Sequence, residues 1–320
     1  MVNDGSAKGR PTPDEILAAL DRTGFIFEYR VAQELRQVGL EAFLNFPFTD
    51  PDTGKSREID IIAHLDDSVT AKGFSVRVAA ILVIECKNYE DPLIVVGEEQ
   101  DTVYRSDPVV TFDPLQLDFP KLSNRYPSLL FNLKLWKRPS HSTKGFVGTQ
   151  LIKMRRQSGR WQATNDSIYD SIVHPLFKAT KEERSTIEAN ERDNPEDEIE
   201  RRLAPTLYYL IPALVTSGDV YTVDVTSNTT PTVAQAAWAP LTRHFDDGLF
   251  QMDVVGFSHI EKYLKERVIP VLEDAKKVMR SHMQWFNPEW LQGRYGTPSD
   301  VKFYQWLTEY NTKYRSTDKG

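Results

Sequence analysis

The feature that most constrains this chain is an uninterrupted apolar run from Val78 to Ile84 that stops at a charged segment, Glu85-Cys86-Lys87. The run is too short for a typical helix and shows no alternation of apolar and polar residues. That pattern is typical of a strand covered on both faces. We therefore expect residues 77–87 to form a central strand of a sheet that lies between two layers of other elements.

The remaining patterns predict an α/β fold, in which a mixed central sheet is flanked by helices. Apolar periodicity predicts a helix over 24–38, and the segments EAFLNFPF and SREIDIIAH (56–64) are expected to be strands. Further on we expect a long, interrupted helical stretch, a hairpin, another strand and a last helix. These cover 148–202, then TLYYLIPALV with DVYTVDV, then LFQMDVVGF, and finally 259–282.

The domain organisation follows from this order of elements and from local composition. Residues 1–13 are small and polar and are predicted to form a flexible arm. One main domain is expected over 14–258, with a proline-rich insertion at about 88–142. Residues 259–320 are rich in aromatic side chains towards their end, and we expect them to form a C-terminal helical extension packed on the core.

Charge and cysteine content exclude several classes of protein. The formal net charge of −7 rules out a general basic coat, so a nucleic-acid-binding surface would have to be local. The single cysteine, Cys86, excludes an intramolecular disulfide and a cysteine-based zinc site, and fits a reducing compartment. No apolar run is long enough to span a bilayer, and no P-loop is present. We expect a cytoplasmic protein with neither a membrane segment nor a nucleotide cofactor.

Polar residues interrupt apolar patterns at four positions. Glu28 lies within the buried stripe that Val31, Ala32 and Leu35 define on its helix. Burying its carboxylate without a partner would cost several kcal/mol, so Glu28 needs either a basic residue across the helix–sheet boundary or a polar site. Asp60 interrupts a strand between two isoleucines, although aspartate is depleted in strands.

Glu85 and Lys87 project to one face of their strand because they are two residues apart. Taken alone, such a pair is more often two solvated residues where a strand leaves the sheet. If the two strands form an antiparallel hairpin, the loop length predicts Asp60 opposite Val83, and a shift of two residues places it opposite Glu85. Carboxylates that close repel unless a cation lies between them, and hard oxygen ligands suit Mg²⁺. Lys87 would add a positive charge beside an attacking water.

The segments GFIFEYRVAQEL, IDIIA and LVIECKNY together resemble the PD-(D/E)XK nuclease superfamily, of the restriction-endonuclease-like type. The likeness covers about residues 22–96, while 148–225 match the αβββαβ order of the family more loosely. The chain has Ile59 where the family pattern has proline before the aspartate.

The resemblance implies a role for each residue of the motif. Asp60 and Glu85 would be the metal ligands, with the carbonyl oxygen of Cys86 as a third. Lys87 would position or deprotonate the attacking water. Glu28 would act near the metal, directly or through a water molecule. The implied function is a Mg²⁺-dependent endonuclease that hydrolyses DNA, with Mn²⁺ as a substitute metal. The alternative is a non-catalytic nucleic-acid-binding or assembly subunit on the same fold, and a homodimer is compatible with both.

A local basic segment suggests where DNA would bind. Residues 121–160 hold ten basic side chains and no acidic one, with aromatic residues among them. If a helix beginning near Gly148 flanks the site, the candidate contacts are Lys144, Gln150, Lys153, Arg155 and Arg156. The alternative is a solvated face that balances the acidic segment at 182–200.

Overall fold

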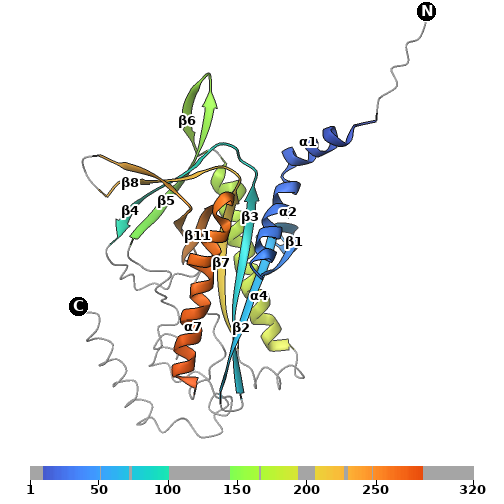
Figure 1. Cartoon of the computed structure of the whole chain (residues 1–320), viewed down its shortest axis with the longest axis vertical. Coiled ribbons are helices and arrows are strands. Elements are labelled where there is room, and N and C mark those ends of the chain that lie inside the picture. Colours follow the sequence, from blue (N-terminus) through green and yellow to red (C-terminus); the bar gives the residue numbers. More distant parts are fainter. Residues whose placement is uncertain are drawn as a thin grey trace, which may run out of the picture.

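The apolar run lies in β3 (Phe74–Lys87), inside a large mixed sheet (Figure 1). The structure is a computed structural model and describes residues 10–50, 52–71, 74–100, 145–165, 167–193, 206–226, 230–246 and 248–283. Every residue from Val78 to Ile84 is at most 2% exposed. The strand pairs antiparallel with β2 (Ser56–Ala71) and parallel with β7 (Thr206–Thr216). The prediction of a central strand covered on both faces is therefore confirmed.

The described strands form a sheet in the order β1-β2-β3-β7-β11-β10-β5-β4-β8-β9, with β6 paired to β5. The other strands are β1 (Glu41–Thr49), β4 (Leu93–Gln100), β5 (Gly145–Gln157), β6 (Arg160–Thr164), β8 (Val220–Asp224), β9 (Thr232–Ala236), β10 (Trp238–Phe245) and β11 (Gly248–Gly256). The pairs β3–β7, β7–β11, β10–β5 and β4–β8 are parallel, and the other pairs are antiparallel.

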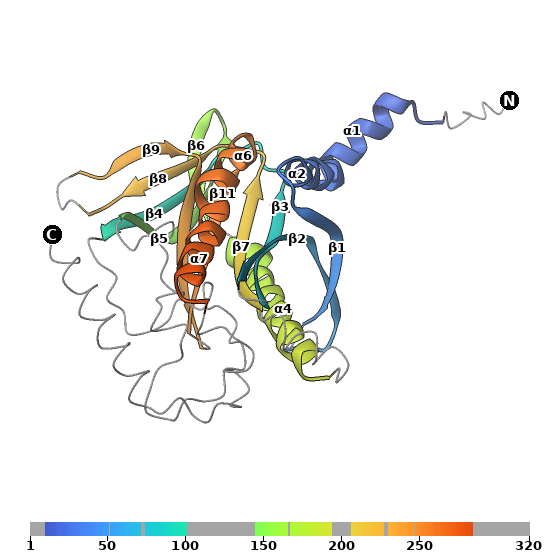
Figure 2. The same cartoon turned by 60° about the horizontal axis from the view of Figure 1, so that its bottom comes forward.

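Helices cover both faces of the β1–β2–β3–β7 part of the sheet (Figure 2). The α-helices are α1 (Pro13–Thr23), α2 (Phe25–Gln37), α4 (His174–Asp193), α6 (Ile260–Tyr263) and α7 (Ile269–Ser281). One core cluster joins α2, α6 and α7 to Ile61, Ile84 and Cys86, and the other joins α4 to Ile62 and Val83. The molecule is thus an α/β protein with a mixed sheet between helical layers. None of the described helices combines the length and apolarity needed to cross a membrane.

The helix expected over 148–202 is wrong in its first part, because residues 145–164 form the antiparallel strands β5 and β6. Ser158 and Gly159 join them, both with positive φ, at 49° and 79°. A two-residue turn with positive φ matches the natural twist of a hairpin and stops a helix. The helical part begins later, with a π-helical turn at Tyr169–Val173 that continues into α4.

The hairpin expected from TLYYLIPALV and DVYTVDV is also wrong. Both segments are strands, but β7 pairs with β3 and β11, whereas β8 pairs with β4 and β9. Both edges of β7 are occupied by parallel neighbours, which local sequence does not reveal. Residues 93–100, expected in an insertion, form β4 inside the sheet. Residues 1–9, 101–144 and 284–320 lie outside the described part of the chain.

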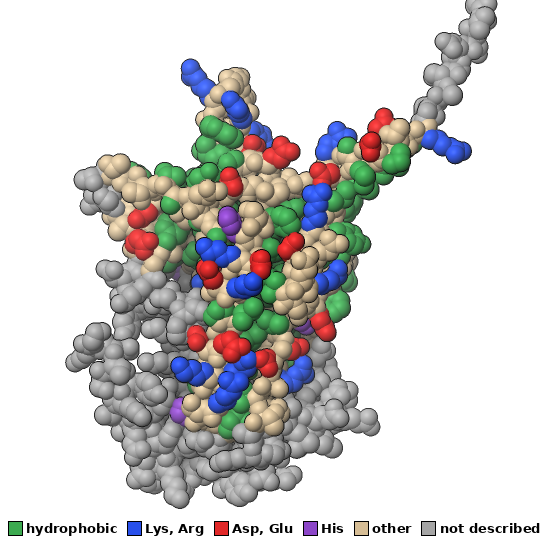
Figure 3. Space-filling view, in the orientation of Figure 1, with side chains coloured by type: hydrophobic (Ala, Val, Ile, Leu, Met, Phe, Trp, Pro, Cys, Tyr) green, Lys and Arg blue, Asp and Glu red, His purple; other side chains and the backbone are tan. Residues whose placement is uncertain are grey.

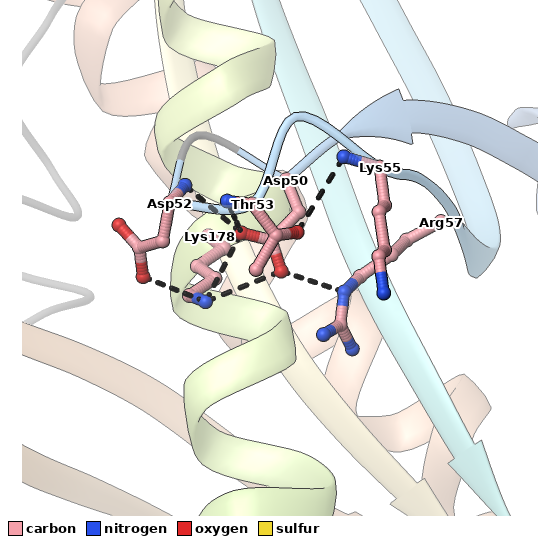
Figure 4. A network of polar contacts seen from close by, with 6 residues as sticks. All are labelled: Asp50, Asp52, Thr53, Lys55, Arg57 and Lys178. Carbon is pink, nitrogen blue, oxygen red and sulfur yellow. Dashed lines mark hydrogen bonds and ion pairs between the residues drawn. The ribbon is translucent and has the colours of Figure 1, made fainter.

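A buried aspartate fastens the β1–β2 turn to α4 (Figure 4). Asp50 has no exposed surface and accepts hydrogen bonds from the backbone N–H groups of Asp52 and Thr53. The same carboxylate forms ion pairs with Lys178 of α4 at 3.1 Å and with Arg57 of β2 at 2.6 Å. These contacts hold the pKa of Asp50 below its usual value although burial acts to raise it. The ion pairs of Asp50 fix α4 against the beginning of β2, the strand that carries Asp60.

A second buried ion pair holds the C-terminal helices on the sheet. Asp253 of β11 accepts from the Arg267 guanidinium at 2.9 and 3.0 Å and from the Tyr263 hydroxyl at 3.0 Å. Asp253 and Arg267 are at most 8% exposed. We expect Arg267→Met to lower the free energy of unfolding by about 3–5 kcal/mol, because Asp253 would remain buried without its cation. Denaturant unfolding of the full chain measures this loss.

The matched control is Lys265→Met, which removes a cation two residues away that is 60% exposed. It should leave the unfolding midpoint nearly unchanged. The double variant Arg267→Met/Asp253→Leu should recover much of the loss, because the unpaired charge is gone. Equal effects of the two single Met variants would contradict a stabilising buried pair.

Candidate active site

The register between β2 and β3 brings Asp60 close to the Glu85-Cys86-Lys87 segment. The antiparallel ladder ends at the pair Ile61 and Ile84, which is the second of the two registers predicted from sequence; the first, with Asp60 opposite Val83, is wrong. Asp60 itself lies just outside this ladder. Strand β2 continues to Ala71 and β3 begins at Phe74. The segment 65–77, which was expected to be a loop, therefore consists mostly of paired strand.

Asp60 lies where the alternation of β2 is interrupted. Ile59 and Ile62 belong to the core cluster on the α4 side, whereas Ile61 belongs to the cluster on the α2 side. Regular alternation would put Ile59 and Ile61 on the same face. On the neighbouring strand, Asn45 adopts a positive φ of 53°. Such irregularities redirect a side chain and are common beside functional sites.

The Asp60 carboxylate reaches the backbone of the Glu85-Cys86-Lys87 segment. Its Oδ2 accepts a hydrogen bond from the N–H of Cys86 at 2.6 Å. Lys87 donates to Glu85 Oε1 in a direct ion pair. The Cys86 thiol is buried in the cluster on the α2 side, which confirms that its side chain packs in the core. The structure thus brings Asp60, Glu85 and Lys87 to one end of the β2–β3 pair.

Glu28 approaches the same end of the sheet from α2. Phe27, Val31, Ala32 and Leu35 bury one face of this helix, and Glu28 itself is half-buried beside them. Burial raises the pKa of Glu28, and the negative charge of Asp60 raises it further, against the attraction of Lys87. Glu28 therefore belongs electrostatically to the group that its helical position predicted.

The site holds more negative charge than its lysine balances. Burial, followed by the charge of Asp60, raises the pKa of Glu85 to about 7 despite the ion pair with Lys87. Burial also raises the pKa of Asp60, although the Cys86 N–H opposes that change. Burial acts to lower the pKa of Lys87, but its attraction to Glu85 raises it above the usual value. Lys87 cannot neutralise three carboxylates, so the site is stabilised either by binding a further cation or by protonation of an acid.

The side chains at this site could hold a hard cation, but they would supply few protein ligands. Asp60 and Glu85 supply carboxylate oxygens, and Mg²⁺ commonly takes only one or two protein carboxylates and completes its shell with water and phosphate. Among the residues that the structure describes, no group of three or more His, Cys, Asp or Glu side chains is arranged to hold a metal ion. Any ion here would therefore rely on two carboxylates, backbone oxygen and water.

The loop after β7 supports the end of β3, a feature that sequence reasoning missed. Ser217 donates its backbone N–H to the carbonyl of Lys87 at 3.2 Å and its hydroxyl to the carbonyl of Tyr89 at 2.9 Å. A Cβ on Gly218 would lie 2.6 Å from the carbonyl oxygen of Tyr89, so only glycine fits there. The Thr-Ser-Gly sequence indicates a turn, but not which segment it contacts.

The predicted DNA contacts lie on a strand instead of a helix. Gln150 and Lys153 would share one face of a helix, but on β5 they point to opposite faces. Gln150 accepts a hydrogen bond from the Tyr169 hydroxyl, whereas the Lys153 ammonium lies 3.4 Å from the centre of the Tyr89 ring. Arg155 and Arg156 are exposed near the end of β5. Lys144 lies outside the described residues.

Known proteins offer no direct guide to this site, because no protein family, curated protein or solved structure matches the chain. Its chemistry has to be inferred from the geometry and charge described above.

The raised pKa of Glu85 predicts a pH dependence of stability. The pKa is 4.5 in the unfolded chain and about 7 in the folded protein, so between these values the folded state holds a proton that the unfolded state releases. The free energy of unfolding of the metal-free protein should fall as pH rises from about 4.5 to about 7. Glu85→Gln should remove the part of this slope that Glu85 contributes and leave the part that comes from the raised pKa values of Asp60 and Glu28. Denaturant unfolding in EDTA at several pH values measures the difference.

Glu266→Gln, which removes an exposed helical carboxylate, is the matched control and should keep the wild-type profile. If Glu85→Gln and wild type show the same pH profile, Glu85 is already ionised at low pH and the charge balance described above is wrong.

Proposed function

We propose that this protein is a Mg²⁺-dependent endonuclease that hydrolyses DNA phosphodiester bonds. The observation that carries the proposal is the grouping of three charged residues at one end of the β2–β3 pair: Asp60 accepts a hydrogen bond from the Cys86 N–H, and Lys87 forms an ion pair with Glu85. The local excess of negative charge is what a divalent cation would neutralise, and the ion pair keeps a lysine at the same place.

The order of elements around the site supports the proposal. Helix α2, the meander β1–β2–β3, helix α4 and strand β7, which pairs in parallel with β3, are compatible with the αβββαβ order of the PD-(D/E)XK family if β4, β5 and β6 are an addition between β3 and α4. The polar motif residues lie together at one end of the β2–β3 pair.

Each motif residue has a distinct task in this proposal. Asp60 and Glu85 would hold the metal, together with the carbonyl oxygen of Cys86. Lys87 would orient the attacking water and offset negative charge that develops on the phosphate. Glu28 would bind a metal-bound water or accept its proton. When bound, the metal ion would polarise the phosphate and favour ionisation of the water.

The N–H of Cys86 fixes the orientation of the Asp60 carboxylate, since it occupies Oδ2 and leaves Oδ1 for a ligand. The ion pair of Lys87 with Glu85 would have to loosen as the metal takes the Glu85 carboxylate, which would free the ammonium group for water and phosphate. Each charged group would thus exchange one partner for another when metal and DNA bind.

Substitution of the motif residues should abolish cleavage without loss of the fold. We expect Asp60→Asn and Lys87→Ala to lower the rate of Mg²⁺-dependent plasmid nicking by at least about 100-fold. Asp66→Asn is the matched control, because Asp66 lies on the same strand with a side chain 42% exposed. Thermal melts of all three variants verify folding. Wild-type nicking rates in folded Asp60→Asn and Lys87→Ala would refute the proposal.

Metal binding should be visible without DNA. Mn²⁺ at about 100 times its dissociation constant should stabilise the folded protein by about 2.7 kcal/mol. Asp60→Ala should abolish this gain and Asp66→Asn should preserve it, as measured by thermal unfolding with and without the ion. Stabilisation by metal without DNA cleavage would instead favour a subunit that needs a partner. Neither stabilisation nor cleavage would favour the alternative of a non-catalytic nucleic-acid-binding protein.

A further inference from the structure

The hairpin of β5 and β6 extends away from the sheet as a two-stranded ribbon (Figure 1). All residues from Arg155 to Ala163 are exposed, so this part packs against none of the described core. From Lys153 to the turn, four residues at about 3.3 Å each give the ribbon a reach of about 13 Å. A two-stranded ribbon of this width can enter the major groove of DNA or lie along its backbone.

One face of this ribbon carries only basic and uncharged polar side chains. Lys153, Arg155 and Gln157 share a face of β5, and their cross-strand partners Thr164, Gln162 and Arg160 point the same way. We call these six residues the basic face. It holds three cations, and between residues 145 and 164 the chain has no acidic residue. Like charges on neighbouring strands repel, so a polyanion that bound here would relieve that repulsion.

The other face of the ribbon carries an exposed aromatic ring. Trp161 is 53% exposed and lies opposite Arg156. Exposed aromatic rings beside arginines are well suited to contact nucleic acid, because a ring can stack on a base while the cations bind phosphate. Figure 3 shows basic side chains at the tip of this projection.

The root of the ribbon adjoins the candidate active site. The Met154 N–H donates to the carbonyl of Pro92 at 2.9 Å, and the Lys153 ammonium lies 3.4 Å from the centre of the Tyr89 ring. Tyr89 follows Lys87 by two residues, and its carbonyl is held by Ser217. A chain of direct contacts therefore joins the basic face to the end of β3, and the ribbon extends from the same end of the molecule (Figure 1).

We propose that the β5–β6 hairpin is a nucleic-acid-binding finger: the basic face holds the phosphate backbone of a polynucleotide, and Trp161 packs against a base or sugar. The inference rests on the proposed function, because DNA cleavage at the end of β3 would bring a polynucleotide to this part of the molecule. It assigns binding roles to Arg160, Trp161 and Gln162. It separates holding the substrate, by the finger, from cleaving it, by the residues at the end of β3.

The test measures binding of the full chain to a fluorescent 30-mer in EDTA, as duplex DNA and as single strand, over a range of salt concentrations. The double variant Arg155→Ala/Arg160→Ala should lower affinity roughly 10- to 100-fold and reduce the salt slope by about 2, because two phosphate contacts are lost. Trp161→Ala should weaken binding roughly 5- to 150-fold if a base stacks on the indole ring, with little change in the salt slope. If the loss of affinity is larger for the single strand than for the duplex, the ring stacks on unpaired bases. If the losses are equal, the ring contacts a groove of the duplex.

Lys277→Ala/Arg280→Ala is the matched control, since it removes two exposed cations from α7. It should bind as wild type does. The inference is overturned if the hairpin variant and this control bind alike, or if wild type shows no salt-dependent affinity for either strand form.

Cleavage in Mg²⁺, measured in parallel, separates this inference from the proposed function. Loss of binding in the hairpin variants without any cleavage by wild type would support the finger and reject the nuclease. Cleavage that depends on Asp60 but is indifferent to Arg155 and Arg160 would reject the finger and support the nuclease.

Discussion

The organisation of the molecule depends on one electrostatic constraint, the burial of several carboxylates with a single lysine at the end of β3. Asp60 lies beside the Glu85-Cys86-Lys87 segment, where it accepts a hydrogen bond from the Cys86 N–H. The apolar layers on the two sides of the sheet exclude the water that would otherwise screen the repulsion between Asp60 and Glu85. Burial therefore raises the pKa of both groups. A stable protein does not need this arrangement, since two apolar residues would pair there at lower cost. This costly arrangement is the reason for the metal-dependent function proposed above.

The surrounding structure holds these groups in place. The Cys86 N–H fixes Asp60, and the backbone of Ser217 holds the end of β3. Farther away, the ion pair of Asp50 with Lys178 fastens the β1–β2 turn to α4, which holds the beginning of β2. The charged groups are thus carried by strands inside a rigid sheet, where their positions are better defined than on loops. The β5–β6 hairpin is different, since it carries its charges on a ribbon exposed to solvent.

The comparison of prediction and structure separates two kinds of information. The pattern of Val78–Ile84 predicted a central strand, and the stripe around Glu28 predicted its helix, because burial on both faces or on one face leaves a local periodicity. Residues 148–164 were predicted as the first part of a helix because short basic segments with scattered apolar residues fit either period. The Ser158-Gly159 turn was the signal that could have corrected this. The pairing of β8 with β4 leaves no such trace, because it joins segments more than a hundred residues apart.

By itself, the sequence determined which residues are candidates for a functional site: an acid in a strand, an acid and a lysine after an apolar run, and an acid on a helical stripe. These are local departures from local patterns, and they can be read without coordinates. Only the tertiary structure decided that Asp60 contacts the Cys86 N–H, that Tyr89 connects the strand end to Lys153, and that the basic residues form the face of a hairpin. Register and long-range pairing depend on the packing of the whole sheet, where a shift of one residue would reverse every side chain.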